Sequence, residues 1–109
     1  MSMDQVASCL AALGNVTRLR IYRILVRAGR PGLPVASVQS QLSIPASTLS
    51  HHLRKLLEVG LVTQEREGTR LICRADYARM QSTFALFLEE CCADEQVAQS
   101  HSANDAPCC

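Results

Sequence analysis

Apolar residues recur along most of the chain with the spacing of amphipathic helices. Apolar positions three and four residues apart predict helices over residues 4–13, 16–28, 35–42 and 76–92. One more helix is expected to begin at Pro45, which suits the first position of a helix, and to stop at Gly60. Asn15 is well placed to cap the second helix. The Pro-Gly-Leu-Pro segment at residues 31–34 is expected to be a loop.

The pattern changes from helical to alternating after Gly60. Residues 61–75 predict two short strands joined by a polar turn at residues 67–68. The two helices before this segment are separated by a tight turn at residues 43–44, which is the arrangement of a helix-turn-helix. A basic-tipped hairpin directly after a helix-turn-helix is a wing. The predicted fold is therefore mainly α with a small β-hairpin wing, a winged helix-turn-helix.

With 109 residues, of which 48% are hydrophobic, the chain is long enough for one domain with a core. Residues 1–92 are predicted to form this domain, and residues 93–109 a flexible tail that carries thiols. No apolar run approaches the roughly 18–20 residues of a membrane span, so no membrane partner is expected. The N-terminal segment has an acid and no basic start, which is unlike a secretory signal. Six cysteines without such a signal indicate reduced thiols in a cytoplasmic protein.

The net charge of +1 conceals an asymmetry along the chain. Residues 14–34 hold five arginines and no acid, whereas residues 76–109 hold one base and six acids. A basic middle and an acidic end indicate a core that binds a polyanion and a C-terminal part with another role.

The helix that begins at Pro45 divides into an apolar side and a polar side. Leu49, Leu53 and Leu56 cluster on a helical wheel and are expected to hold the helix against the core. In a recognition helix, short polar side chains of the N-terminal half reach base edges, and basic residues further along meet phosphates. The candidate DNA-binding residues of this helix are Ser47, Thr48, Ser50, His51, Arg54 and Lys55.

Two arginines flank the tip of the predicted wing. Arg66 and Arg70 lie where a minor groove or the DNA backbone could be met, and they complete the candidate DNA-binding set. The polar side of the recognition helix could instead be a solvated face, and the attached wing is what favours double-stranded DNA as the partner. His52 lies beside the apolar stripe and is expected to be a partly buried, hydrogen-bonded residue rather than a base reader.

Four short motifs together resemble the ArsR/SmtB family of metal-responsive repressors. They are Thr17-Arg18-Leu19, Ser50-His51-His52-Leu53, Gly60-Leu61-Val62 and Glu67-Gly68. The resemblance covers about residues 6–90. It implies a homodimer joined through its first and last helices, an operator with two-fold symmetry, and release from DNA when an inducer binds. The apolar stripes of these two helices point independently to self-association, because a small monomer does not readily hide them.

Two well-known sensing sites of this family are missing from the chain. The Cys-x-Cys motif would fall at residues 34–42, which hold no thiol. The zinc site of the last helix would need histidines at residues 76–90, where there are none. A zinc sensor of that type is therefore not expected, and the remaining candidates are two Cys-Cys pairs.

Soft thiolates suit trivalent arsenic and antimony, which prefer three sulfur ligands in a pyramid. The resemblance agrees, since some arsenic-responsive members carry a Cys-Cys at the end of the last helix and a third cysteine beyond it. The predicted ligands of As(III) or Sb(III) are Cys91, Cys92, Cys108 and Cys109, with one of the last two as the third thiol. Cys9 and Cys73 occupy inward positions and are expected in the core, although either stays an alternative third ligand.

The chain is therefore predicted to be a DNA-binding transcriptional repressor that arsenite or antimonite removes from its operator. A thiol-redox or persulfide switch on the same scaffold, using Cys91 or Cys92 with a tail cysteine, is the alternative. A response that needs three cysteines favours the metalloid, and one that needs two favours disulfide chemistry. An enzyme with a catalytic cofactor is not expected, since the chain lacks a catalytic triad pattern and a phosphate-binding loop.

Overall fold

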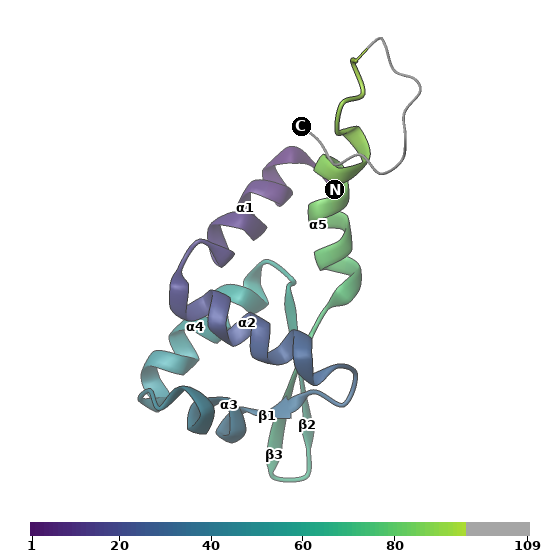
Figure 1. The fold of residues 1–109 in the computed structure, drawn as a ribbon. Coiled ribbons are helices and arrows are strands. Elements are labelled where there is room, and N and C mark those ends of the chain that lie inside the picture. The colour runs from purple at the N-terminus through teal and green to yellow at the C-terminus, as the bar shows by residue number, and fades with distance from the viewer. Residues whose placement is uncertain (96–109) are drawn as a thin grey trace.

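The computed structural model describes residues 1–95, which form five helices and one three-stranded sheet. The helices are α1 (Met3–Leu13), α2 (Val16–Ala28), α3 (Val35–Leu42), α4 (Ala46–Glu58) and α5 (Tyr77–Glu90), and the strands are β1 (Leu33–Pro34), β2 (Val62–Glu67) and β3 (Arg70–Ala75). In Figure 1, α2, α3 and α4 form the body, the β2–β3 hairpin extends to one end, and α1 and α5 extend to the other. This order of elements confirms the predicted winged helix-turn-helix.

Local signals in the sequence place the helix boundaries close to the predicted ones. The Asn15 Oδ1 atom accepts a hydrogen bond of 3.0 Å from the Arg18 amide at the start of α2, as expected. Ser43 ends α3 in the left-handed region (φ 54°) and turns the chain toward α4. Pro45 is the N-cap of α4, one residue before the helical position that the sequence favours for it. The extended backbone of Pro45 (ψ 149°) is the reason that the helix begins one residue later.

The apolar side of α4 holds this helix to the body of the domain. Leu49, Leu53 and Leu56 are at most 3% exposed and share one core with Ile21 and Leu25 of α2. Full burial of an aliphatic side chain of this size stabilises the fold by about 1.5–3 kcal/mol. The rotation of α4 that buries the leucines leaves its polar side facing outward.

Two of the cysteines belong to the core, as the sequence predicts. Cys9 on α1 and Cys73 on β3 are 1% and 0% exposed. The Cys9 sulfur donates to the Val59 carbonyl oxygen at 3.6 Å, and the Cys73 sulfur accepts from the Gln64 amide nitrogen at 3.4 Å. Burial raises the pKa of the Cys73 thiol, and the hydrogen bond from Gln64 offsets only part of this effect. The thiolate form that a metalloid needs is therefore disfavoured at Cys73.

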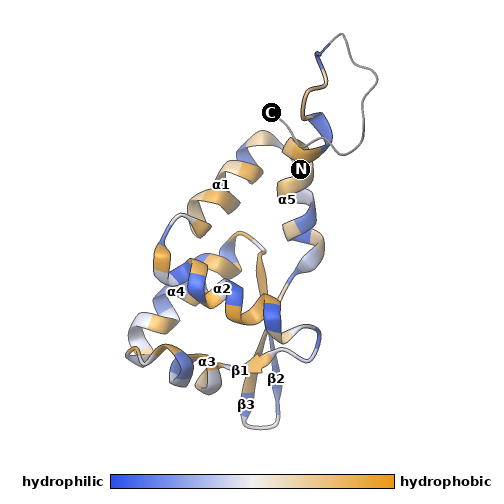
Figure 2. Cartoon of the chain, viewed as in Figure 1, coloured by the Kyte–Doolittle hydropathy of each residue, from blue (hydrophilic) through white to orange (hydrophobic). Residues whose placement is uncertain are grey.

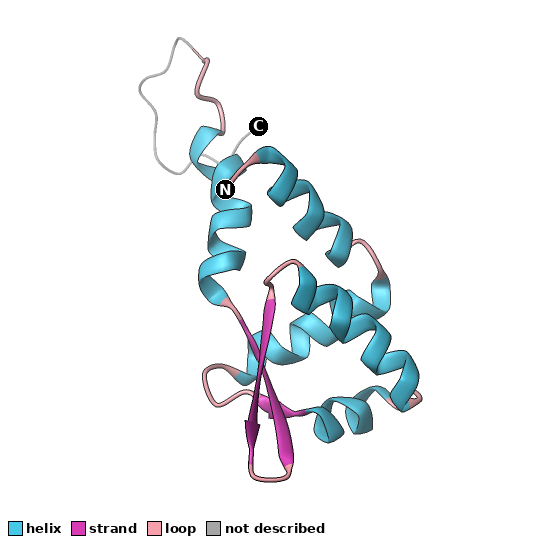
Figure 3. Ribbon diagram, turned by 180° about the vertical axis from the view of Figure 1, so that it is seen from behind, coloured by secondary structure: helices cyan, strands magenta, loops and turns pink. Residues whose placement is uncertain are grey.

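A third strand joins the predicted hairpin. β1 pairs antiparallel with β3, with Leu33 opposite Cys73 and Pro34 opposite Ile72, so the strand order is β1-β3-β2. The expectation of a loop at residues 31–34 is wrong for the two residues of β1. A strand this short shows no alternation in the sequence, and proline is tolerated in it because β1 lies at the sheet edge. Figure 3 shows the sheet from behind, with β3 running directly into α5.

The last helix exposes most of its large apolar side chains. α5 ends at Glu90, two residues earlier than predicted, because the backbone of Cys91 is extended (ψ 124°). Thr83 is its one buried residue. The exposed apolar side chains of α5 are Tyr77, Phe84, Phe87 and Leu88. Figure 2 shows hydrophobic segments in orange on both α5 and α1. Such exposure is what the predicted dimer interface needs.

None of the helices in residues 1–95 is both long and apolar enough to cross a membrane.

Candidate DNA-binding surface and cysteine pair

The polar side of α4 faces away from the core. Ser47, Ser50, His51, Arg54 and Lys55 lie at exposed positions and Thr48 is half-buried. The start of α4 and the tip of the β2–β3 hairpin both lie toward the lower end of the molecule in Figure 1. The residues predicted to meet DNA therefore come from two elements at the same end of the domain.

The N-terminal end of α4 adds backbone donors to this surface. Pro45 is the N-cap and makes no side-chain hydrogen bond to the first turn. The first amide groups of a helix have no carbonyl partner within the helix. Together with the helix dipole they favour a phosphate at this end. Ser47 in the first turn is exposed next to these amide groups.

His52 lies on the flank of α4 and contacts the scaffold. Its Nδ1 atom is 3.2 Å from the Nη1 atom of Arg18 on α2. Burial is the main cause that lowers the pKa of the His52 imidazole, and the cation of Arg18 and the neighbouring His51 lower it further. The expectation of a partly buried, hydrogen-bonded histidine is confirmed.

The two predicted wing arginines lie on different faces of the hairpin. Arg66 pairs in register with Leu71, whereas Arg70 pairs with Glu67. Residues paired across two strands share a face, and successive residues alternate between faces. Both arginines are exposed. Arg70 therefore shares its face with a carboxylate, and Arg66 shares its face with a leucine.

Arg74 is a wing residue that the sequence analysis does not single out. Its guanidinium donates to Glu65 at 2.8 Å and to Glu67 at 3.3 Å. Its Nε atom donates to the carbonyl oxygen of Arg30 at 2.8 Å, in the segment before β1. Arg74 thus attaches the hairpin to the body and pairs with two acids that would otherwise repel DNA. The carbonyl partner is 44 residues away in the chain, and no local pattern marks such a contact.

Cys91 and Cys92 follow the end of α5 at exposed positions. Their sulfur atoms are 3.7 Å apart, which is well beyond the roughly 2.0 Å of a disulfide bond. Cys91 is itself disulfide-bonded in this structure. The predicted reduced state of the cysteines stays a prediction.

The other two predicted thiol ligands belong to the C-terminal end of the chain. Cys108 and Cys109 lie outside the described residues, as does most of the predicted tail at residues 93–109. Within residues 1–95, no three His, Cys, Asp or Glu side chains gather in a way that could hold a metal ion. The division of the chain after residue 92 stays a prediction.

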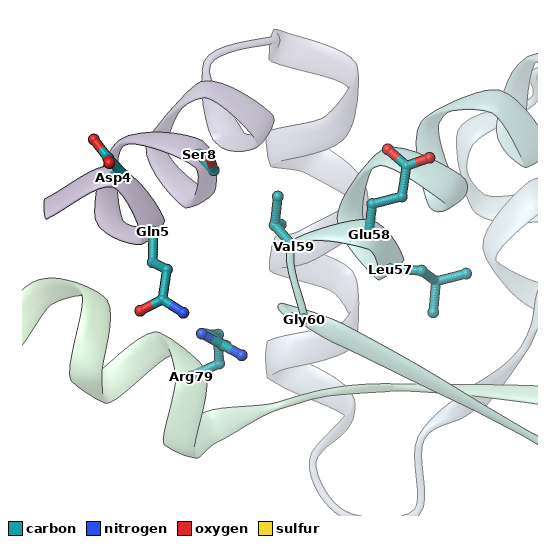
Figure 4. Close-up of a pocket in the computed structure, with 8 residues that line it drawn as sticks. All are labelled: Asp4, Gln5, Ser8, Leu57, Glu58, Val59, Gly60 and Arg79. Atoms are coloured by element: carbon teal, nitrogen blue, oxygen red, sulfur yellow. The ribbon is translucent and has the colours of Figure 1, made fainter. Parts of the chain in front are cut away.

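A pocket of about 400 Å³ lies between α1, α5 and the C-terminal end of α4. The residues that line it are Asp4, Gln5, Ser8, Leu57, Glu58, Val59, Gly60 and Arg79. Figure 4 shows the Arg79 guanidinium beside Gly60 and directed toward Gln5. None of the predicted DNA-binding or thiol residues lines this pocket.

The fold and the surface define the class of this protein. A helix-turn-helix with an outward polar second helix and a wing behind it is the architecture of winged-helix proteins that bind DNA. The family model for a helix-turn-helix domain matches residues 13–65 of the chain. The match covers α2, α3, α4 and the start of the wing.

The chain is similar in sequence to known transcriptional regulators. The chain is 35% identical over 66 residues to an uncharacterized HTH-type transcriptional regulator of Methanocaldococcus jannaschii, covering 61% of this chain and 72% of that one. It is 44% identical over 59 residues to a putative arsenical resistance operon repressor of Halobacterium salinarum, covering 54% of this chain and 45% of that one. The match thus spans less than half the length of the second relative.

A solved structure agrees with these sequence relationships. The homodimeric winged helix-turn-helix DNA-binding domain of a possible ArsR-family regulator from Mycobacterium bovis superimposes with a TM-score of 0.64 at 31% identity. The superposition covers 91% of this chain and 90% of that one. The chain belongs to the ArsR family of winged helix-turn-helix transcriptional regulators.

Proposed function

We propose that this regulator is a repressor that trivalent arsenic or antimony releases from operator DNA. The observation that carries the proposal is the pair of exposed cysteines directly after α5, with sulfur atoms 3.7 Å apart. Thiolates are the soft ligands that such ions take. The similarity to a putative arsenical resistance operon repressor supports the same chemistry.

The proposed ligands are Cys91 and Cys92, with Cys108 or Cys109 as the third thiol. Each sulfur must be reduced and deprotonated to bind, so the disulfide at Cys91 has to open first. Affinity for the metalloid is therefore expected to rise with pH through the titration range of the thiols. Cys73 is a poorer third ligand, because burial raises the pKa of its thiol.

The position of the pair offers a route from inducer to DNA. The cysteines end the helix that exposes Phe84, Phe87 and Leu88, the surface proposed for dimerisation. A ligand that pulls this end toward a third thiol tilts one subunit against the other and changes the separation of the two α4 helices. A coupling free energy of about 1–3 kcal/mol corresponds to roughly 5- to 150-fold weaker operator binding. DNA must weaken metalloid binding by the same factor.

The test is a titration of the fully reduced protein on DNA. The probe is a fluorescent duplex selected by the wild-type protein from a random-sequence pool, and the readout is anisotropy during addition of arsenite, antimonite, zinc or cadmium. Arsenite or antimonite is expected to release the duplex at lower concentration than zinc. Cys91→Ser and Cys92→Ser are expected to bind the duplex normally and to ignore both metalloids.

Matched controls locate the third ligand. Removal of residues 107–109 is expected to weaken the response without changing DNA affinity, and Cys9→Ala is expected to leave both unchanged. A truncated protein with full sensitivity would exclude the tail thiols and move the third ligand to Cys9 or Cys73. A Cys91→Ser protein that still responds would contradict the proposal itself.

A thiol-redox switch is the second candidate, and the disulfide at Cys91 is the observation that favours it. In that case an oxidant or a persulfide donor releases the reduced protein from DNA, and arsenite does not. Two cysteines then suffice, so single serine variants of Cys91 and Cys92 separate the candidates, because metalloid binding needs both residues and one disulfide needs only one of them. An oxidant response that is lost in only one of these two variants supports disulfide chemistry at that cysteine.

A further inference from the structure

Arg18 joins three elements of the domain through a single side chain. Its amide is capped by Asn15 at the start of α2. Its Nε atom donates to the carbonyl oxygen of Ala12 in the last turn of α1 at 2.6 Å. Its Nη1 atom lies 3.2 Å from Nδ1 of His52 on α4. The guanidinium therefore bridges the end of α1 and the recognition helix.

The contact defines the protonation state of His52. A guanidinium has only donors, so the Nδ1 atom of His52 must accept the hydrogen bond. The imidazole is then neutral, with its proton on Nε2. Arg18 from α2 and His51 from α4 are the charged or titratable groups that act on His52. Burial and both of these groups lower the pKa of His52, which agrees with the neutral form.

His52 is also next to the surface predicted to read DNA. The rings of His51 and His52 meet edge to face, with centroids 5.4 Å apart and planes inclined by 63°. His51 is exposed on the polar side of α4. The leucines on the opposite side hold α4 through apolar contacts, which have no directional preference. A hydrogen bond is directional, and the one from Arg18 lies on the flank between these two sides.

We propose that His52 is a positioning residue for DNA recognition: bound by Arg18 as a neutral imidazole, it fixes the rotation of α4 and the orientation of His51. This role rests on the DNA binding of the proposed function and does not depend on the identity of the inducer. Protonation of His52 turns Nδ1 into a donor and places two cations 3.2 Å apart, so it breaks the link. Operator binding therefore weakens as the pH falls below the ordinary imidazole range, beyond any effect of His51.

Two substitutions of His52 test its hydrogen-bond acceptor and its aromatic ring separately. The Oδ1 atom of asparagine occupies a position close to that of Nδ1 in histidine, so His52→Asn keeps the acceptor and cannot take up the proton. His52→Phe keeps the ring contact with His51 and removes the acceptor. Arg18→Lys replaces the rigid fork of donors by one ammonium on a flexible stem, so it does not hold the Ala12 carbonyl and His52 in the same fixed geometry.

The experiment compares affinities for the selected duplex and for a random duplex of equal length, between about pH 7.5 and pH 5. His52→Phe and Arg18→Lys are each expected to bind the selected duplex about tenfold more weakly at the upper pH, with less than about twofold change on random DNA. His52→Asn is expected to bind within about twofold of wild type and to lose the acid-dependent part of the profile. The double variant with His52→Phe and Arg18→Lys is expected to bind the selected duplex no more weakly than Arg18→Lys alone, since both substitutions remove the Arg18–His52 contact.

Each result decides the assignment. Equal losses on both duplexes, additive losses in the double variant, or a wild-type pH profile in His52→Asn would each overturn it. Nitrogen-15 spectra of the imidazoles test it without DNA and without a variant: the Nε2–H form of His52 and a pKa below the ordinary range are expected. A protonated or Nδ1–H ring at neutral pH would contradict the link. Failure to select any preferred duplex would count against the proposed function instead.

Discussion

Gly32 passes so close to Cys73 that a Cβ atom on Gly32 would lie 2.5 Å from the Cys73 carbonyl oxygen. The backbone of Gly32 is also in the left-handed region, with φ at +67°. Gly32→Ala therefore meets both backbone strain and a clash with a strand that cannot move freely. We expect it to lower the free energy of unfolding by at least about 2 kcal/mol, measured by urea denaturation.

Gly68 at the wing tip is the matched control for this prediction. It has a similar φ of +64°, but nothing lies within 4 Å of its ideal Cβ position. Gly68→Ala is therefore expected to lower the free energy of unfolding only through backbone strain, by about 1–2 kcal/mol. Equal losses of unfolding free energy in Gly32→Ala and Gly68→Ala would contradict a destabilising clash between the new Cβ atom at residue 32 and β3.

The polar side of α4 leads to a prediction about DNA specificity. His51→Ala and Ser47→Ala are expected to weaken binding to the selected duplex by about 1–3 kcal/mol each and to change binding to random DNA little, because base contacts carry sequence information. Arg54→Ala is expected to weaken both and to reduce the salt dependence, because phosphate contacts release counterions. Anisotropy titrations at several salt concentrations measure both effects. Identical losses on both duplexes in all three variants would contradict the assignment of this surface.

The two faces of the wing predict unequal roles for its arginines. Arg66 shares its face with Leu71, whereas Arg70 lies opposite Glu67. The Glu67 carboxylate, which its 3.3 Å pair with Arg74 offsets only in part, reduces the positive potential that a phosphate meets beside Arg70. Arg66→Ala is therefore expected to weaken DNA binding and to lower the salt dependence more than Arg70→Ala does. The comparison is informative because both side chains are exposed, so neither variant should unfold the domain. Equal effects would show that the tip bends enough to present both faces.

Local signals in the sequence are sufficient for much of this fold. The boundaries of α2 and α3 agree with the prediction because a capping asparagine and a left-handed serine act within one turn of the chain. The outward polar side of α4 follows from helical periodicity in the same way. Those signals involve residues that are neighbours in sequence, so the sequence alone contains them.

The features that sequence analysis misses depend on contacts between distant segments. β1 exists because Leu33 and Pro34 meet β3 about 40 residues later. The Arg18–His52 contact spans 34 residues, and the Arg74–Arg30 contact spans 44. Their residue types are common on helices and strands, so only the three-dimensional pairing distinguishes them.

The exposed apolar side of α5 predicts how two copies associate. Phe84 and Met80 line a hollow of about 350 Å³ against α2, and with Leu88 they line a second hollow of about 590 Å³. Phe87 is 52% exposed and Leu88 is 75% exposed, which is costly in water for side chains of this size. We expect a symmetric dimer in which α5 and α1 of two protomers cover these surfaces.

Sedimentation equilibrium at micromolar protein checks this prediction. Leu88→Glu is expected to weaken the dimer at least about tenfold, because it buries a charge in an apolar interface. Ser82→Glu, on the same helix but outside both hollows, is the control and is expected to leave the dimer intact. The Leu88 variant is also expected to lose most affinity for a duplex with two half-sites about one helical turn apart, but little for a single half-site. A wild-type monomer at micromolar concentration would contradict the dimer, because the exposed face of α5 would then have no partner in solution.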